Sequence, residues 1–252
     1  MPFRDRLYLS TTAEDAPALA REYDLGLEIA EYCTASHMDE DFPETDAAVR
    51  RRMKGVERFT FHAPFNELCP AAIDPLVRRL TQQRYRQAIR LARAYGFRKI
   101  VIHSGFIPLV YYPSWFVAES VPFWREFLAQ VPEDMTLCLE NVMEPGPDML
   151  LEIVARVDDP RFRLCLDVGH AATRVSGAAP IDWIGPYAPF LAHVHLHNND
   201  GDWDLHQPLG EGVLDMAAIL TQTERLCPEV TYTIENMRCA PSLEWLEQRG
   251  YL

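Results

Sequence analysis

The chain has 252 residues, 48% of them hydrophobic, a formal net charge of −13 and a pI near 5.0. This length suits one α/β barrel or two smaller domains. The acidic balance disfavours nucleic acid as a partner, because duplex binding normally needs a basic surface. A small neutral or metal-chelating substrate is easier to reconcile with this charge.

Targeting signals are not evident in the sequence. No run of about 18 apolar residues occurs, so no membrane span is expected. Residues 1–12 contain no apolar signal core, and the six cysteines form no CxxC pair. These features predict a cytoplasmic protein with reduced thiols.

Short apolar or β-branched runs alternate with longer amphipathic segments along the chain. Strands are predicted at 7–12, 25–32, 58–64, 99–105, 136–142, 163–170, 192–199 and 230–236. Helices are predicted at 13–24, 44–55, 75–95, 116–130, 147–157, 213–226 and 242–249, and the Gly/Pro-rich segment 171–190 is expected to hold only a short helix. The clearest helix is 75–95, with apolar residues at three- and four-residue steps and Gly96 as its stop.

This alternation predicts βαβ units and a parallel sheet. Eight repeats favour closure into a single (β/α)8 TIM barrel with its active site at the carboxyl ends of the strands. No linker long enough to separate two domains is visible, so residues 1–252 are expected to form one domain.

Side chains that can bind metals recur at the predicted strand ends. They are His62, His103, Glu140, Asp167, His170, His195 and Glu235, joined by Asp204 and His206 from the loop after the seventh strand. A single histidine or glutamate of this kind is usually a packing or solvated residue. Several carboxylates at one rim, however, are costly to bury without positive charge, and divalent cations supply that charge. The set therefore predicts a metal site.

The seventh strand carries three histidines on one side. His193, His195 and His197 alternate along it, so all three point the same way. His195 is the expected ligand, His193 lies deeper and is expected to be structural, and His197 is expected at the mouth of the strand in contact with substrate.

Seven motifs carry a resemblance to a known superfamily. They are FHAPF at 61–65, IVIHSG at 100–105, LEN at 139–141, DVGH at 167–170, HVHLHNND at 193–200, DLHQPLGEG at 204–212 and IEN at 234–236. The chain resembles the xylose isomerase-like TIM-barrel superfamily over nearly its whole length. That superfamily includes sugar isomerases, ketose 3-epimerases and the endonuclease IV family.

The two branches of this superfamily imply different metal centres. The epimerase branch implies one ion held by Glu140, Asp167, His195 and Glu235, with both glutamates moving the substrate proton and His170 touching substrate. The endonuclease IV branch implies further zinc ions, one held by His62, His103 and Glu140 and one by His170, Asp204 and His206. The cofactor implied is one to three divalent ions, Zn²⁺ or Mn²⁺.

Three functions remain open at this point. The first is a metal-dependent isomerase or epimerase of a small sugar or polyol, in which Phe65, His197, Trp115 of the aromatic segment 106–116, and Arg238 are further candidate substrate contacts. Arg174 or Arg238 would replace an arginine that ketose epimerases commonly place after the strand-seven histidine. The second is a zinc-cluster phosphoesterase, disfavoured by the negative charge and by Phe65 where the nuclease pattern has tyrosine.

The third function is a barrel that stores or senses metal, although mixed ligands at open strand ends are more typical of a reactive site. Metal stoichiometry separates the two enzymes, because an epimerase needs one ion and this kind of hydrolase two or three. The sequence leaves homo-oligomerisation open.

Overall fold

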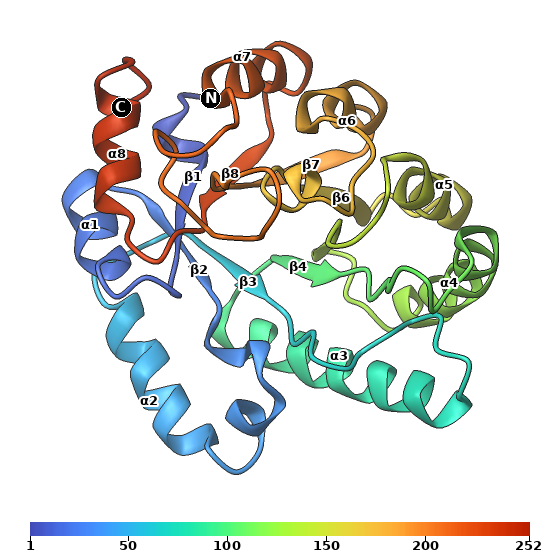
Figure 1. Cartoon of the computed structure of the whole chain (residues 1–252). Helices are drawn as coiled ribbons and strands as arrows, with labels where there is room; N and C mark the ends of the chain where they lie inside the picture. The colour runs from blue at the N-terminus through green and yellow to red at the C-terminus, as the bar shows by residue number, and fades with distance from the viewer.

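The computed structural model describes residues 1–252 as one closed barrel of eight parallel strands in sequential order (Figure 1). The strands are β1 Leu7–Ser10, β2 Gly26–Ile29, β3 Phe59–His62, β4 Lys99–His103, β5 Thr136–Glu140, β6 Phe162–Asp167, β7 Leu191–Leu196 and β8 Thr231–Ile234. Each pairs with the next, and β8 returns to pair with β1. The predicted TIM barrel is confirmed.

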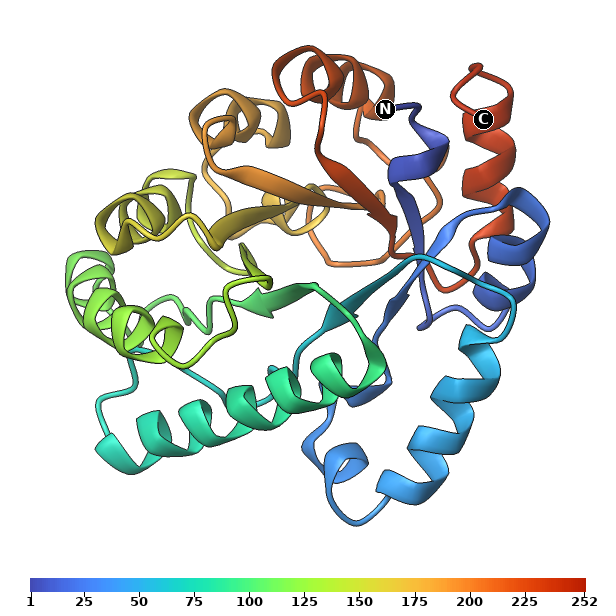
Figure 2. The ribbon, with the colours of Figure 1, turned by 180° about the vertical axis from the view of Figure 1, so that it is seen from behind.

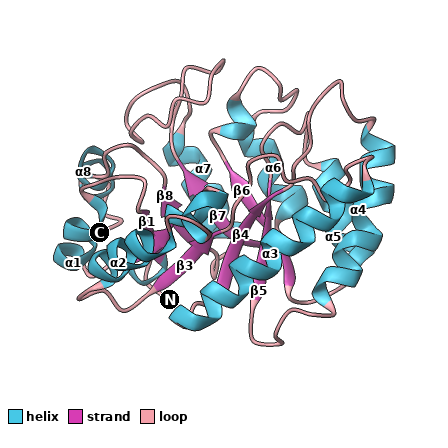
Figure 3. Cartoon of the chain, turned by 90° about the horizontal axis from the view of Figure 1, so that it is seen from below, coloured by secondary structure: helices cyan, strands magenta, loops and turns pink.

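Eight helices form a ring outside the barrel, as the view from behind and the perpendicular view both show (Figures 2 and 3). They are α1 Ala16–Tyr23, α2 Phe42–Met53, α3 Pro75–Tyr95, α4 Pro113–Leu128, α5 Asp148–Val157, α6 Pro180–Tyr187, α7 Met216–Leu226 and α8 Ala240–Glu247. Four short 3₁₀ helices are η1 Arg4–Arg6, η2 Glu31–Cys33, η3 Ala35–Met38 and η4 His170–Ala172. None of the helices is long and apolar enough to cross a membrane.

Local capping explains where the elements differ from the predicted ranges. Helix α3 has the predicted bounds because Asp74 accepts a hydrogen bond from the Leu76 N–H and Gly96, at φ 84°, ends the helix. Strand β6 stops at Asp167, earlier than predicted, because the His170 N–H turns back to donate to Asp167 Oδ1 at 2.7 Å. Segment 171–190 contains the short helix α6, as expected.

The strand residues divide between two environments because side chains alternate across a sheet. Leu27 and Ile29 belong to the large apolar core that fills the space between the strands and the helices. Glu28 lies between them and faces the barrel interior, where it is fully buried. Polar side chains at alternating positions of the strands are therefore collected inside the barrel, beneath its carboxyl-end rim.

Candidate metal centre and active site

The nine metal-competent residues expected from the sequence come together at the carboxyl ends of the strands. Five of them are strand residues: His62, His103, Glu140, Asp167 and His195. Glu235 follows β8 directly, His170 begins η4, and Asp204 and His206 lie in the loop between β7 and α7. The loop is held by paired backbone hydrogen bonds of 2.8 Å between Asn198 and Gln207, and His206 adopts a left-handed φ of 49°.

The first group consists of Glu140, Asp167, His195 and Glu235, whose ligand atoms lie within 4.8 Å of one another. His195 Nδ1 is at its centre, 3.0 Å from Glu140 Oε1 and 2.9 Å from Glu235 Oε2. Asp167 Oδ2 lies 3.7 Å from the same nitrogen. Three carboxylates and one imidazole thus point at one small volume.

Glu140 also faces a second group. Its other oxygen, Oε2, lies 3.4 Å from His62 Nε2 and 3.3 Å from His103 Nε2. Because the two oxygens of one carboxylate face separate sets of imidazoles, Glu140 has the placement of a bridge between two neighbouring ligand sets.

A third group is formed by His170, His197, Asp204 and His206, again within 4.8 Å. Asp204 Oδ2 lies 3.3 Å from His170 Nε2 and 3.1 Å from His206 Nε2. The His206 ring is fixed from behind, because its Nδ1 lies 2.7 Å from the Glu235 carbonyl oxygen. This group is nearer to solvent, since the Asp204 side chain is 38% exposed.

The spacing of these atoms fits divalent cations. Ligand atoms about 2.0–2.1 Å from a tetrahedral zinc ion lie roughly 3.3 Å from one another. The distances from Glu140 Oε2 to His62 and His103, and from Asp204 to His170, are 3.3–3.4 Å. In addition, Glu140 Oε2 is buried and has no hydrogen-bond partner. Burying a carboxylate oxygen without a hydrogen-bond donor is energetically unfavourable. A cation between these residues would neutralise the buried charge.

The carboxylates of the site stay ionised because imidazoles surround them. Burial alone raises the pKa of Glu140, but the neighbouring imidazoles of His195 and His103 hold it well below the ordinary value. Burial lowers the pKa of His103 to about 4, which leaves a neutral ring. Burial also acts to lower the pKa of His206, but its hydrogen bond to Asp204 and the nearby Glu235 raise it to about 9. Carboxylates that stay ionised beside imidazoles match the chemistry of metal ligands.

Glu28 is a site residue that the sequence did not reveal. Its Oε1 lies 3.0 Å from His195 Nε2, the nitrogen on the far side of the ring from the carboxylates. Its Oε2 accepts hydrogen bonds from Thr60 and Thr233 at 2.9 and 3.0 Å and lies 3.1 Å from His193 Nε2. Glu28 therefore contacts His195 from behind, and His193 lies deeper in the barrel, 2.6 Å from Thr231 Oγ1 and 2.9 Å from Thr233 Oγ1. The only sequence signal is an acid, Glu28, between the apolar residues Leu27 and Ile29.

Cys33 is a second site residue that the sequence did not reveal. Its Sγ lies 3.2 Å from His62 Nδ1, behind the ring nitrogen that faces Glu140. The thiol is partly exposed and lines the cavity described below. It contacts His62 in the way that a residue supporting a metal ligand does.

Three residues expected to contact substrate are not in the cavity wall. His197 is fully buried, with Nε2 2.9 Å from Asp167 Oδ1, and its ring stacks on His206 at 4.1 Å. A Cβ at position 169 would come within 1.9 Å of that ring, so glycine there lets the backbone cover His197. Trp115, in helix α4, stacks its ring on Tyr111 with the centroids 5.7 Å apart, and Arg238 is exposed outside the cavity.

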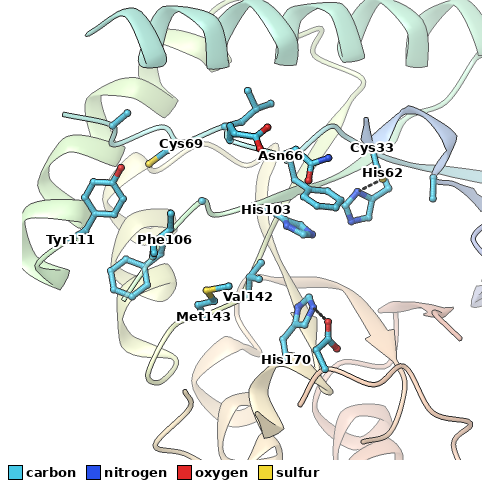
Figure 4. Close-up of a pocket in the computed structure, with 18 of the residues that line it drawn as sticks. Cys33, His62, Asn66, Cys69, His103, Phe106, Tyr111, Val142, Met143 and His170 are labelled. Atoms are coloured by element: carbon cyan, nitrogen blue, oxygen red, sulfur yellow. Dashed lines mark hydrogen bonds and ion pairs between the residues drawn. The ribbon is translucent and has the colours of Figure 1, made fainter. Parts of the chain in front are cut away.

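The cavity has a volume of about 770 Å³ and opens above the metal-competent residues (Figure 4). Phe65, another expected contact, lines it and stacks on His103 at 4.2 Å. The ionisable side chains in the wall are Cys33, His62, Glu67, Cys69, Asp74, His103, Tyr111, His170, Asp204, His206 and Glu235, so the wall contains no lysine or arginine. A polyanionic substrate would find no guanidinium or ammonium group here.

The chain belongs to the xylose isomerase-like TIM barrel family, whose sequence profile matches residues 18–226. The protein MJ1311 of Methanocaldococcus jannaschii, which is itself uncharacterized, is 31% identical over 185 residues. That alignment covers 69% of this chain and 63% of the relative, so the chain matches less than two thirds of the relative's length.

Solved structures of similar fold include a D-tagatose 3-epimerase-like protein, with a TM-score of 0.78 and 24% identity over 98% of this chain and 96% of that one. The TTHB071 protein of Thermus thermophilus, from a crystal soaked with ZnCl₂, gives a TM-score of 0.75 and 28% identity over 97% and 98%. Family and fold together place the chain among the xylose isomerase-like TIM barrels.

Proposed function

We propose that this protein is a divalent-metal-dependent isomerase or epimerase of a small hydroxylated substrate, such as a sugar or polyol. The observation that carries the proposal is the position of Glu235. Its side chain belongs to the buried four-ligand group and also lines the cavity. A carboxylate there can reach both the ion and a substrate proton.

Glu140, Asp167, His195 and Glu235 would hold the principal ion, because three of these four side chains are fully buried and the fourth, Glu235, also reaches the cavity. A divalent cation in this position would polarise a chelated carbonyl and acidify the adjacent C–H bond. Zinc suits the many imidazoles, and TTHB071 crystals were soaked with it, although manganese also accepts such carboxylates.

Proton transfer is assigned first to Glu235. Its side chain is 12% exposed and faces the cavity, as a general base must. Glu140 was expected to share this role, but it is fully buried and does not line the cavity, which favours a role as a ligand. His170 lines the cavity beside Glu235 and is the proposed hydrogen-bonding contact to substrate.

Phosphoester hydrolysis is the second candidate, because Glu140 faces two ligand sets and Asp204 organises a third. Two or three close cations are typical of such hydrolases. The absence of lysine and arginine from the cavity wall and the net charge of −13 place this function second.

Exchange of a substrate hydrogen with deuterium from the solvent distinguishes the isomerase from the phosphoesterase. Zinc- or manganese-loaded protein is incubated with a panel of ketoses in D₂O, and deuterium at the carbon next to the carbonyl is followed by NMR. Exchange is expected, and Glu235→Gln should lower its rate by about 100-fold or more. Arg98→Ala, a substitution of an exposed residue paired only with Asp134, is the matched control. Hydrolysis of bis(p-nitrophenyl) phosphate without exchange into any ketose would favour the second candidate.

A further inference from the structure

The cavity has two chemically different ends. In Figure 4, His62, His103 and His170 lie on one side, and Phe106, Tyr111 and Cys69 lie on the other. Beyond the histidines the wall is made largely of carbon: Leu68, Val77, Phe106, Ile107 and the ring of Tyr111. A compact polyol bound at the metal-competent end would leave this wall facing water.

The apolar wall continues onto the surface. Ile73 and Ile107, which line the cavity, are 69% and 48% exposed. Leu109, Val110 and Tyr112, in the same loop as Ile107, are all more than half exposed. Neighbouring apolar side chains exposed in this way are typical of a ligand-binding groove. The exposed apolar segment adjoins the cavity because Ile107 belongs to both.

The volume of the cavity and the charges in its wall limit the kind of ligand that it can bind. A cavity of about 770 Å³ lies in the upper part of the range of roughly 300–1,000 Å³ that holds drug-sized molecules. No lysine or arginine lines it, so the part of the ligand beyond the metal centre needs no negative charge. The side chains of Leu68, Val77, Phe106 and Ile107 offer no hydrogen-bond partner to the hydroxyls of a second sugar ring.

We infer that the substrate is amphipathic: a hydroxylated head that chelates the ion, joined to an uncharged aryl or alkyl group that lies along Leu68, Val77, Phe106, Ile107 and Tyr111. The position of the head rests on the proposed function. The apolar group rests on the wall and its exposed continuation.

Alkyl hydroxamates test the two parts separately, because the hydroxamate binds zinc whatever the natural head is. Acetohydroxamate and octanohydroxamate are titrated into zinc-loaded protein by calorimetry. Each methylene that becomes buried tightens binding by about fourfold, so burial of half of the six added methylenes gives an affinity gain of about 60-fold.

Two substitutions in the cavity wall test where the alkyl group of octanohydroxamate binds. Ile107→Asp and Ile73→Asp change exposed side chains, so both should fold. Each substitution is expected to lower the affinity advantage of octanohydroxamate over acetohydroxamate at least tenfold. The affinity for acetohydroxamate itself should stay unchanged. Leu226→Asp, at the exposed end of α7 and outside the cavity, is the control and should keep the full gain.

Equal affinity for the two hydroxamates would overturn the inference and leave the metal centre standing. A chain-length gain that survives in both Ile variants would also overturn it, because the alkyl group would then lie elsewhere. Failure of both hydroxamates to bind would overturn the proposed metal centre and the anchored substrate together.

Discussion

At the scale of single residues, the sequence indicated which metal-competent residues would lie together, but not the residues that contact them from behind. His62, His103 and Glu140 follow apolar runs, and barrel topology places strand ends at one rim. Glu28 supports His195 from a strand far away in the chain, so no local pattern reports the contact. His197 was expected at the mouth, but the turn at Gly169 covers it, and that close approach depends on packing between two loops.

Glu28→Gln tests the support of His195. The amide keeps the volume but can donate to His195 Nε2, which weakens the hold on the orientation in which Nδ1 faces the carboxylates. Loss of such a partner typically lowers metal affinity by about 10- to 100-fold. Zinc affinity is measured by competition with a chromophoric chelator, and Glu211→Gln, at an exposed position, is the control. An unchanged affinity would remove Glu28 from the site.

At the scale of elements, the order of strands and helices was predictable because the hydrophobic period changes between 2 and 3.6 along the chain. Helix 75–95 was placed well because Asp74 and Gly96 bracket it. The ends of strands were placed less well. At Asp167, for example, a side chain caps the following turn and ends β6, and periodicity does not reveal such a contact.

Closure of the barrel at its amino-terminal end depends on an ion pair between the residue before β1 and helix α7. Arg6 is 3% exposed, and its Nη1 and Nη2 lie 2.8 and 2.6 Å from the two Glu224 oxygens. Glu224→Gln leaves the guanidinium without its counter-charge. A fully buried pair would cost about 3–5 kcal/mol to break, and the 29% exposure of Glu224 reduces this to about 2 kcal/mol of unfolding free energy.

The difference in unfolding free energy between the unsubstituted protein and Glu224→Gln should depend on pH. Burial acts to raise the pKa of Glu224, but the hydrogen bonds from Arg6 and Tyr232 lower it below the unfolded value. The pair's contribution is therefore complete above about pH 5 and is lost as the pH falls through the folded pKa. Urea denaturation at a series of pH values should show the two proteins converging in acid. A difference in unfolding free energy that stays constant down to low pH would contradict the charge pairing of Glu224 with Arg6.

At the scale of the whole molecule, charge and cavity chemistry restrict the function more than the fold does. The barrel hosts many reactions, and the particular reaction depends on the side chains at its rim. The net charge of −13 and a cavity wall without lysine or arginine agree in disfavouring nucleic acid. The apolar part of the cavity depends on how the loops after β3 and β4 meet, so the sequence suggested only that the segment 106–116 lies near the site.

Metal binding should stabilise the whole barrel, because the ligands come from six strands or their following loops and gather only in the folded chain. Free zinc at 100 times its dissociation constant adds about 2.7 kcal/mol. For a chain of 252 residues this raises Tm by about 5–10 °C. Scanning calorimetry with zinc and with EDTA measures the shift, and Asp167→Asn should reduce it. An equal Tm in both conditions would mean that the site does not bind zinc when folded.

The most direct measurement is the metal content per chain, by elemental mass spectrometry, of protein purified without added metal and then exposed to a mild chelator. The account predicts one retained ion in the group of Glu140, Asp167, His195 and Glu235, absent from Asp167→Asn, with ions at the less buried groups removed. Two or three ions held equally tightly would contradict the isomerase assignment in favour of phosphoester hydrolysis. A protein that neither retains nor takes up metal would contradict the metal centre itself.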